Sequence, residues 1–324
     1  MACDDLTKDP NLSDSCIFVN DGPSAQWWMS PDINLNGFTD VAFANQNNTI
    51  DVTVHRGPES AQCDKLTAAS NIVVEVWVSL PGLNLSPATQ ANIIDTKIIP
   101  KAQLPANGTR TLSAAGQLVN WTPGTDGTKP NGPGHRCLIS RCYPEGDGPP
   151  DPDCFHVRGD SHVAQRNIEI TTVSPRIKNR LIVEVMTVNP DRDHPTPATV
   201  RVVTDPQPAG RVMEILEPGL RNTGVFKRVT STPPAKMDLQ FPSLTGVKIR
   251  HNTRAGCLPS LFGRRGYASS VEADVVLNAG ESTPFRFEAD LSKGTRGDAF
   301  VFYLTHLRAD RQEIGGLTVV GVLA

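Results

Sequence analysis

Cysteine and histidine side chains gather in one short stretch of the chain, between residues 134 and 170. Imidazole nitrogen and thiolate sulfur are ligands that zinc prefers. The two pairs His135/Cys137 and Cys154/His156 are each spaced two residues apart, so each pair would point to one face of a strand. Cys142 adds a fifth candidate ligand. The set has no C-x2-C spacing, so the alternative is a disulfide, a buried cysteine and two surface histidines.

Carboxylates occupy the loop between Cys142 and Cys154. Asp147, Asp151 and Asp153 supply the oxygen ligands that calcium accepts on a flexible loop. The spacing lacks the D-x-D-x-D-G order of an EF-hand. The alternative is a solvated acidic loop that stays outside any sheet.

Arg158-Gly159-Asp160 follows this loop and forms an RGD tripeptide. Such a tripeptide on an exposed turn can bind a metal-ion site of a partner protein. The same residues are ordinary turn chemistry, and this second interpretation is the one we favour.

The chain has seven cysteines, and this odd number permits both a fully reduced protein and one with three disulfides. Cys3 and Cys16 bracket a short polar segment, while Cys142 and Cys154 flank the acidic loop. We favour oxidised pairs and take these four residues as the disulfide candidates.

Aromatic and basic side chains provide candidate binding surfaces. Trp27 and Trp28 are adjacent, so on a strand they face opposite ways and one is expected at the surface or under an N-terminal arm. Together with Trp121 they could form a platform on which sugars stack. Arg264-Arg265 could hold a phosphate or an acidic partner, although a solvated loop is the simpler interpretation.

Short segments with alternating apolar and polar residues recur along the chain, separated by turn residues. The clearest are residues 71–80 (NIVVEVWVSL) and 180–189 (RLIVEVMTVN). Trp77 in the first is expected to face the core. Many short strands at roughly 8–12 residue spacing indicate sandwiches or barrels, and no segment shows an apolar helical period over eleven residues. Residues 212–216 are predicted as a strand or a short helix.

These patterns predict an all-β protein of two tandem antiparallel immunoglobulin-like β-sandwich domains, because two facing sheets hide the apolar face of each strand. The first domain is placed at residues 27–174 and the second at 175–324. Residues 1–26 are polar and rich in turns, so we expect an N-terminal arm that orders only against another surface.

Composition excludes several classes of function. The 31 basic and 34 acidic residues are nearly balanced, which argues against nucleic acid and anionic membranes as partners. No apolar run approaches the roughly 20 residues of a spanning helix. The N-terminus has no apolar signal-peptide core, so we expect either use without classical export or a signal already removed.

Three short motifs carry a resemblance. They are W-x-S-P-D-I at Trp28–Ile33, H-x-C-L-I-x-R at His135–Arg141 and V-A-Q-R-N-I at Val163–Ile168. In these motifs the chain resembles the immunoglobulin-like modules of bacterial secreted and surface proteins, including CARDB-type domains. The resemblance covers mainly residues 27–172. It implies an accessory binding or assembly module, extracytoplasmic location and no catalytic residue.

We therefore expect a non-enzymatic structural or interaction protein, self-assembling or docking within a surface-type complex, with protein partners and no cofactor. Hydrolase motifs such as G-x-S-x-G and H-E-x-x-H are absent from the sequence. The alternatives are a carbohydrate or cell-surface binding module built on the tryptophans, and an accessory domain of a metal-dependent hydrolase that uses the Cys/His cluster.

Overall fold

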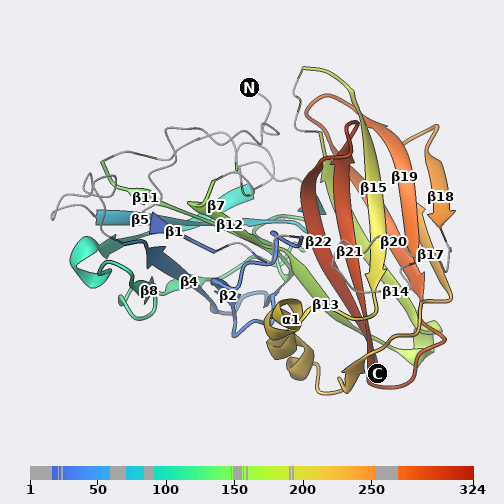
Figure 1. Cartoon of the computed structure of the whole chain (residues 1–324), viewed down its shortest axis with the longest axis horizontal. Helices are drawn as coiled ribbons and strands as arrows, with labels where there is room; N and C mark the ends of the chain where they lie inside the picture. The colour runs from blue at the N-terminus through green and yellow to red at the C-terminus, as the bar shows by residue number, and fades with distance from the viewer. Residues whose placement is uncertain are drawn as a thin grey trace. The chain divides into compact units, whose positions relative to one another are not determined.

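The structure is a computed structural model of the whole chain. It describes residues 17–20, 22, 25–58, 71–83, 91–146, 148, 155, 157, 160–189, 191, 193–252 and 269–324. The chain divides into two compact units (Figure 1). Unit 1 comprises Met1–Leu80 and Leu85–Arg166, and unit 2 comprises Pro81–Asn84 and Asn167–Ala324.

Unit 1 is built from short strands in three sheets. Its elements are β1 (Ile17–Phe18), β2 (Ile33–Leu35), β3 (Val41–Ala42), β4 (Asn48–Arg56), β5 (Asn71–Ser79), β7 (Ala91–Pro100), the 3-10 helix η1 (Lys101–Gln103), β8 (Thr109–Thr111), β9 (Val119–Trp121), β10 (Gly134–His135), β11 (Cys137–Pro144) and β12 (Val163–Arg166). One sheet is organised around β4, which pairs with β1, β2, β8 and β9. A second has the order β12-β11-β5-β7, and β10 pairs with β3.

The core of unit 1 follows from the alternation of β4 and β5. Ile50, Val52 and Val54 of β4 are fully buried, and the residues between them are half-buried. Val74 and Val76 of β5 belong to the same apolar cluster. Burial of each such side chain contributes about 1.5–3 kcal/mol.

Unit 2 is a β-sandwich of a larger and a smaller sheet. Its elements are β6 (Gly82–Leu83), β13 (Ile168–Val173), the 3-10 helix η2 (Pro175–Ile177), β14 (Arg180–Val188), β15 (Thr196–Asp205), α1 (Gly210–Asn222), β16 (Arg228–Val229), β17 (Lys236–Gln240), β18 (Lys248–Asn252), β19 (Ser270–Leu277), β20 (Ser282–Asp290), β21 (Asp298–Arg308) and β22 (Glu313–Leu323). The larger sheet has the order β13-β22-β21-β15-β19-β18, with β16 beside β21, and the smaller has the order β17-β20-β14-β6.

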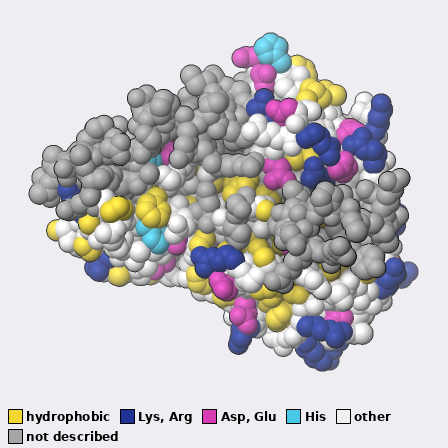
Figure 2. Space-filling view, viewed as in Figure 1, with side chains coloured by type: hydrophobic (Ala, Val, Ile, Leu, Met, Phe, Trp, Pro, Cys, Tyr) yellow, Lys and Arg dark blue, Asp and Glu magenta, His cyan; other side chains and the backbone are white. Residues whose placement is uncertain are grey.

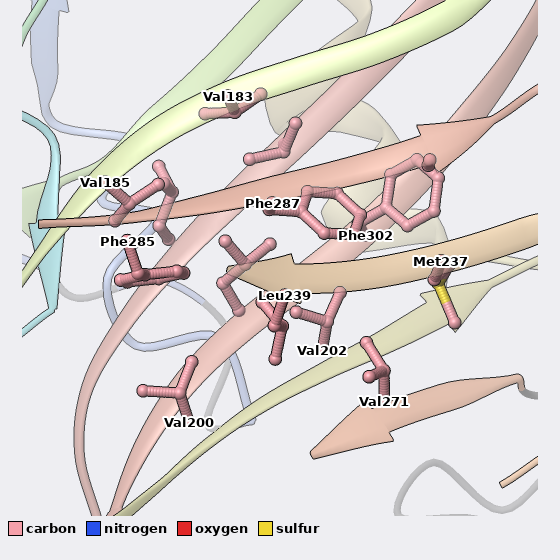
Figure 3. Packing of buried hydrophobic residues seen from close by; sticks show 14 of the residues in the cluster. Val183, Val185, Val200, Val202, Met237, Leu239, Val271, Phe285, Phe287 and Phe302 are labelled. Atoms are coloured by element: carbon pink, nitrogen blue, oxygen red, sulfur yellow. The ribbon is translucent and has the colours of Figure 1, made fainter. Parts of the chain in front are cut away.

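The two sheets of unit 2 enclose one apolar core. Val200 and Phe302 come from the larger sheet, and Val183 and Phe287 come from the smaller one (Figure 3). The Phe287 and Phe302 rings pack edge to face, with centroids 5.1 Å apart. The all-β prediction is confirmed. Antiparallel pairing prevails, but β13–β22, β14–β6 and β16–β21 are parallel pairs.

The division between the units differs from the predicted boundary at residue 174. Within the sequence of residues 164–172, Asn167 separates β12 of unit 1 from β13 of unit 2. The Asn167 side-chain amide donates to the carbonyls of Gly82 and Gly316, and the Asn167 backbone carbonyl accepts from Thr318 N–H. These bonds fix the start of β13 to unit 2.

A short piece of the N-terminal half also belongs to unit 2. Strand β6 pairs with β14, and Leu83 is fully buried in the unit 2 core. The Pro81 carbonyl accepts from Met186 N–H at 3.0 Å. The chain therefore passes between the units three times, a feature that the sequence pattern did not predict.

Helix α1 corrects the expectation for residues 212–216, since the helix extends over thirteen residues. Its buried side chains, Val212, Ile215, Leu216 and Leu220, have helical spacing. Pro218 lies inside the helix and is followed by a glycine, and both residues mask the helical pattern in the sequence. Within the described residues, α1 and the other helical segments are too short or too polar to span a bilayer.

Candidate interaction surface

The predicted zinc ligands that the structure describes lie in unit 1, where Cys137 and Cys142 are buried and His135 is half-buried with both ring nitrogens shielded from solvent. Cys137 and Cys142 are free thiols on β11, and burial raises the pKa of both. Their spacing is odd, so they face opposite sides of the sheet. Burial lowers the pKa of His135 on β10 to about 3, with a further contribution from the positive charge of Arg136.

The other members of this group cannot be placed. Cys154 and His156 lie outside the described residues, as do Asp147, Asp151 and Asp153 of the calcium hypothesis. Among the described residues, no three His, Cys, Asp or Glu side chains are grouped as metal ligands would be. The metal sites remain predictions, whereas the predicted disulfide at Cys142 is not present in this structure, in which Cys142 is a free thiol. The candidates Cys3, Cys16, Arg264 and Arg265 also lie outside the described residues.

The tryptophans do not form an exposed stacking platform. Trp27, Trp28 and Trp121 are 6%, 0% and 5% exposed, respectively. Trp77 is half-buried, but it lies on the face of β5 opposite the core, beside Phe155 at a centroid distance of 5.5 Å. The platform expectation is wrong because these three side chains are buried. Trp77 faces away from the core because Val74 and Val76 take the core face of β5.

The aspartate of the RGD tripeptide is also buried. Asp160 Oδ1 accepts hydrogen bonds from His162 N–H and from His162 Nδ1, at 2.9 and 2.7 Å. Arg158 and Gly159 lie outside the described residues. Because the Asp160 carboxylate is held inside the protein, it is not displayed on a turn for a partner.

Two buried charge clusters in unit 1 were missed by the sequence analysis. Glu75 accepts from Arg141, Tyr143 and Trp77 on the outer face of the β5–β11 pair, at 2.7–3.0 Å. A charged residue in the middle of an otherwise apolar strand, such as Glu75, was the available signal. These groups satisfy one another, so they stabilise the sheet rather than offer a reactive centre.

The second cluster joins the end of β12 to a tight turn. Arg166 donates from Nε and Nη2 to the two carboxylate oxygens of Asp40, at 2.5 and 2.8 Å, and from Nη1 to the Ser30 carbonyl. Its guanidinium also lies 5.0 Å from the centre of the Phe38 ring. Phe38 and Asp40 have φ values of 66° and 57°, a region that bulky residues adopt only when held there.

Strand β7 lies at one edge of its sheet in unit 1. In the described part of the chain, β5 pairs with one side of β7 and no strand pairs with the other. Ile93 and Ile98 are 48% and 39% exposed, which is unusual for isoleucine on a sheet. Both lie on the outer face, opposite Trp77 and Val73 of β5.

A β-bulge interrupts the pairing of β7 with β5. Val76 pairs with Asp95 and Trp77 pairs with Ile93, so Ile94 is left over on β7. A groove of about 420 Å³ opens beside the bulge. It is lined by Val78, Ala91, Asn92, Ile93, Ile94 and Asn131.

The middle of β7 carries one acid and one base on the same face. Asp95 Oδ2 and Lys97 Nζ are 2.7 Å apart, and Asp95 Oδ1 accepts from Thr96 N–H at 2.8 Å. Both charged side chains lie on the core side at the margin of the sheet, where such charges discourage pairing with strands of unrelated proteins. We define the β7 edge surface as Ile93, Asp95, Thr96, Lys97 and Ile98.

The described surface on the face drawn in Figure 2 has mixed charge. The face shown in Figure 2 carries basic and acidic side chains side by side, with neither sign gathered into a separate field. On unit 2, Glu272 contacts Arg201, Arg250 and Arg311, and Arg250 also bonds Asp274. In this group of side chains the basic and acidic charges compensate one another, so the group does not select a charged partner.

No family model and no curated protein matches the chain. Among solved structures, the collagen adhesin (CNA) from S. aureus aligns at 8% identity over 86% of this chain and 88% of the adhesin, with a TM-score of 0.21. The CupB6 tip adhesin from Pseudomonas aeruginosa aligns at 9% identity over 95% and 97%, with a TM-score of 0.18. The CfaE adhesive subunit from enterotoxigenic Escherichia coli aligns at 8% identity over 94% of this chain and 92% of CfaE, with a TM-score of 0.19.

Proposed function

We propose that this chain is a non-enzymatic interaction subunit that binds an extended protein strand along the β7 edge surface. The observation that carries the proposal is an open ten-residue edge strand with two exposed isoleucines on one face. Edge strands accept another strand through main-chain hydrogen bonds, while side-chain pockets give specificity. The groove beside the bulge provides such a pocket for one apolar side chain of the partner.

The energetic basis is burial of Ile93 and Ile98 together with new backbone hydrogen bonds. Each backbone bond contributes about 0.5–1.5 kcal/mol, and full burial of an isoleucine contributes about 1.5–3 kcal/mol. The proposal includes the extracytoplasmic setting and the accessory role that the resemblance of residues 27–172 implies. The buried tryptophans give no support to the carbohydrate alternative.

A labelled synthetic peptide with the sequence of residues 91–100 tests strand addition directly. Fluorescence anisotropy should show saturable binding of this peptide to the full chain, whereas a scrambled peptide should not bind. In the variant Ile93→Lys/Ile98→Lys the affinity should fall at least tenfold, because two charges replace the apolar contact. Since both positions are exposed, the fold of this variant is expected to persist, which circular dichroism checks.

The matched control is Ile182→Lys. Ile182 is 41% exposed on β14 of unit 2 and lies outside the β7 edge surface. The control chain should bind the peptide as the unaltered chain does. Equal binding to the Ile93→Lys/Ile98→Lys chain, or no saturable binding to the unaltered chain, would refute the proposed function.

A further inference from the structure

We infer that the strand bound by the β7 edge surface is β7 of a second copy, antiparallel to the first about a two-fold axis at Thr96. This inference rests on the proposed function and names its partner. The evidence is the order of charges and apolar side chains along β7, which is complementary to itself when the strand is reversed.

The charges select the register. With Thr96 opposite Thr96 of the second copy, Asp95 lies opposite Lys97 of the second copy and Lys97 opposite Asp95. Directly opposed side chains on one face are about 4.5–5.5 Å apart at Cβ, and opposite charges there are favourable. Because Asp95 and Lys97 already form an ion pair within the strand, the pairing creates a ring of four charges of alternating sign.

Neighbouring two-fold registers are disfavoured by the same charges. A shift of the axis to residue 95 sets Asp95 against Asp95, and a shift to residue 97 sets Lys97 against Lys97. Like charges directly opposite one another are destabilising. A slip of one residue sets the outer-face Thr96 against the inner-face Asp95, and side chains then meet on the wrong faces.

The outer-face side chains fit the same register. Thr96 meets Thr96 at the axis, and because the bulge leaves Ile94 packed against the core, Ile98 of each copy lies across from Ile93 of the other. Threonine pairs and β-branched pairs across strands are both favourable. The two isoleucines that are 48% and 39% exposed in the single chain become covered.

The backbone around Thr96 is compatible with pairing. The Thr96 N–H is bonded by the Asp95 side chain, so an incoming strand replaces one short-range bond with a main-chain bond. The bulge at Ile94 and the proline at the end of β7 stop the ladder on both sides. Because a two-fold contact uses the same patch on both copies, it closes as a dimer rather than a fibre.

Complementary charge reversal tests the register. Sedimentation velocity of the full chain, from about 1 µM to about 1 mM, should show a monomer–dimer equilibrium. Asp95→Lys places lysine opposite lysine, and Lys97→Asp places aspartate opposite aspartate, so each variant alone should dissociate at least tenfold more readily. An equimolar mixture of the two variants restores opposite charges at both contacts, and so does the double variant Asp95→Lys/Lys97→Asp. Both should dimerise as the unaltered chain does.

Asp95→Asn controls for loss of the Thr96 cap, because an amide oxygen can still accept from Thr96 N–H. It should weaken the dimer less than Asp95→Lys. Peptide binding combined with a monomeric chain at every concentration would overturn this inference and leave the proposed function intact. The inference also falls if the chain dimerises through Ile93 and Ile98 but the mixture of charge variants does not recover.

Discussion

His306 is expected to make unit 2 sensitive to acid. Its side chain lies inside the sandwich, 2% exposed, on β21 of the larger sheet. Its Nδ1 is 3.2 Å from the Thr187 hydroxyl on β14 of the smaller sheet. Burial lowers the pKa of His306 from 6.5 to about 4, since an imidazolium in this position would lose its hydration.

The sign of the effect follows from proton linkage. The folded pKa lies below the unfolded value, so the unfolded chain takes up the proton first as the pH falls. The stabilisation is fully present above about pH 6.5 and is lost progressively as the pH falls to about 4. The difference between these two pKa values corresponds to about 3 kcal/mol of unfolding free energy.

The variant His306→Gln removes this titration and keeps a side chain that can bond Thr187. At pH 7.5 it should be less stable than the unaltered chain by about 1–2 kcal/mol through altered packing. Between pH 7.5 and pH 4 the unaltered chain should lose about 3 kcal/mol more than the variant. His194→Gln is the matched control, because the His194 side chain is 77% exposed in the same unit.

Urea unfolding at several pH values measures the difference. All four tryptophans belong to unit 1, so their fluorescence reports unit 1, while far-ultraviolet circular dichroism reports both units. The transition of unit 2 is the component seen by circular dichroism and not by fluorescence. A free-energy difference between the unaltered chain and His306→Gln that stays constant from pH 7.5 to pH 4 would refute the reasoning.

Three further predictions concern other buried groups. Loss of surrounding water raises the pKa of half-buried Glu169 on β13 to about 7, so the stabilisation from its protonated form is present below about pH 4.5 and is lost as the pH rises through about 7. Glu169→Gln should therefore raise the unfolding free energy by about 2–3 kcal/mol at pH 8 and by little at pH 4. Circular dichroism measures this difference. Arg166→Met leaves Asp40 buried without its partner and should cost unit 1 about 3–5 kcal/mol by tryptophan fluorescence; Asp40→Leu/Arg166→Met should recover most of it, and a double variant as unstable as the single one would contradict this account. Leu83→Ala should lower the stability of unit 2 by about 2–5 kcal/mol, because a cavity opens in that core; a change in the tryptophan-detected transition alone would contradict it.

The strands could be predicted because apolar and polar residues alternate in their sequences, and burial in the structure follows this alternation. In β4 and β14 every second side chain is inward-facing over most of the strand, and the residues between them are polar or exposed. Residues 93–99 (IIDTKII) are also rich in β-branched residues, and β7 spans them. Its position at the edge could not be predicted, because edge and central strands share the same local pattern and differ only in distant pairing.

The interaction surface was missed for a related reason. Exposure of Ile93 and Ile98 depends on the absence of a neighbouring strand on one side of β7 in the described structure, which no local pattern encodes. The prediction for the tryptophans was wrong in the opposite sense. Their residue type suggested a binding surface, but long-range packing buries Trp27, Trp28 and Trp121. Buried pairs such as Arg166 and Asp40 are 126 residues apart in sequence, so their spacing gave no signal.

The three chain passages between the units have a consequence for how the gene can be divided. A fragment cut at Asn167 would carry most of unit 2 but not β6, so β14 would lose its parallel neighbour and the core would lose Leu83. The complementary fragment would carry β6 without its sheet. During synthesis, residues 81–84 leave the ribosome before the strands that they join, so β6 can pair only after the C-terminal half has been made. Unit 2 is therefore a spatial domain that no single continuous segment encodes, and neither unit can be exchanged between proteins as one block.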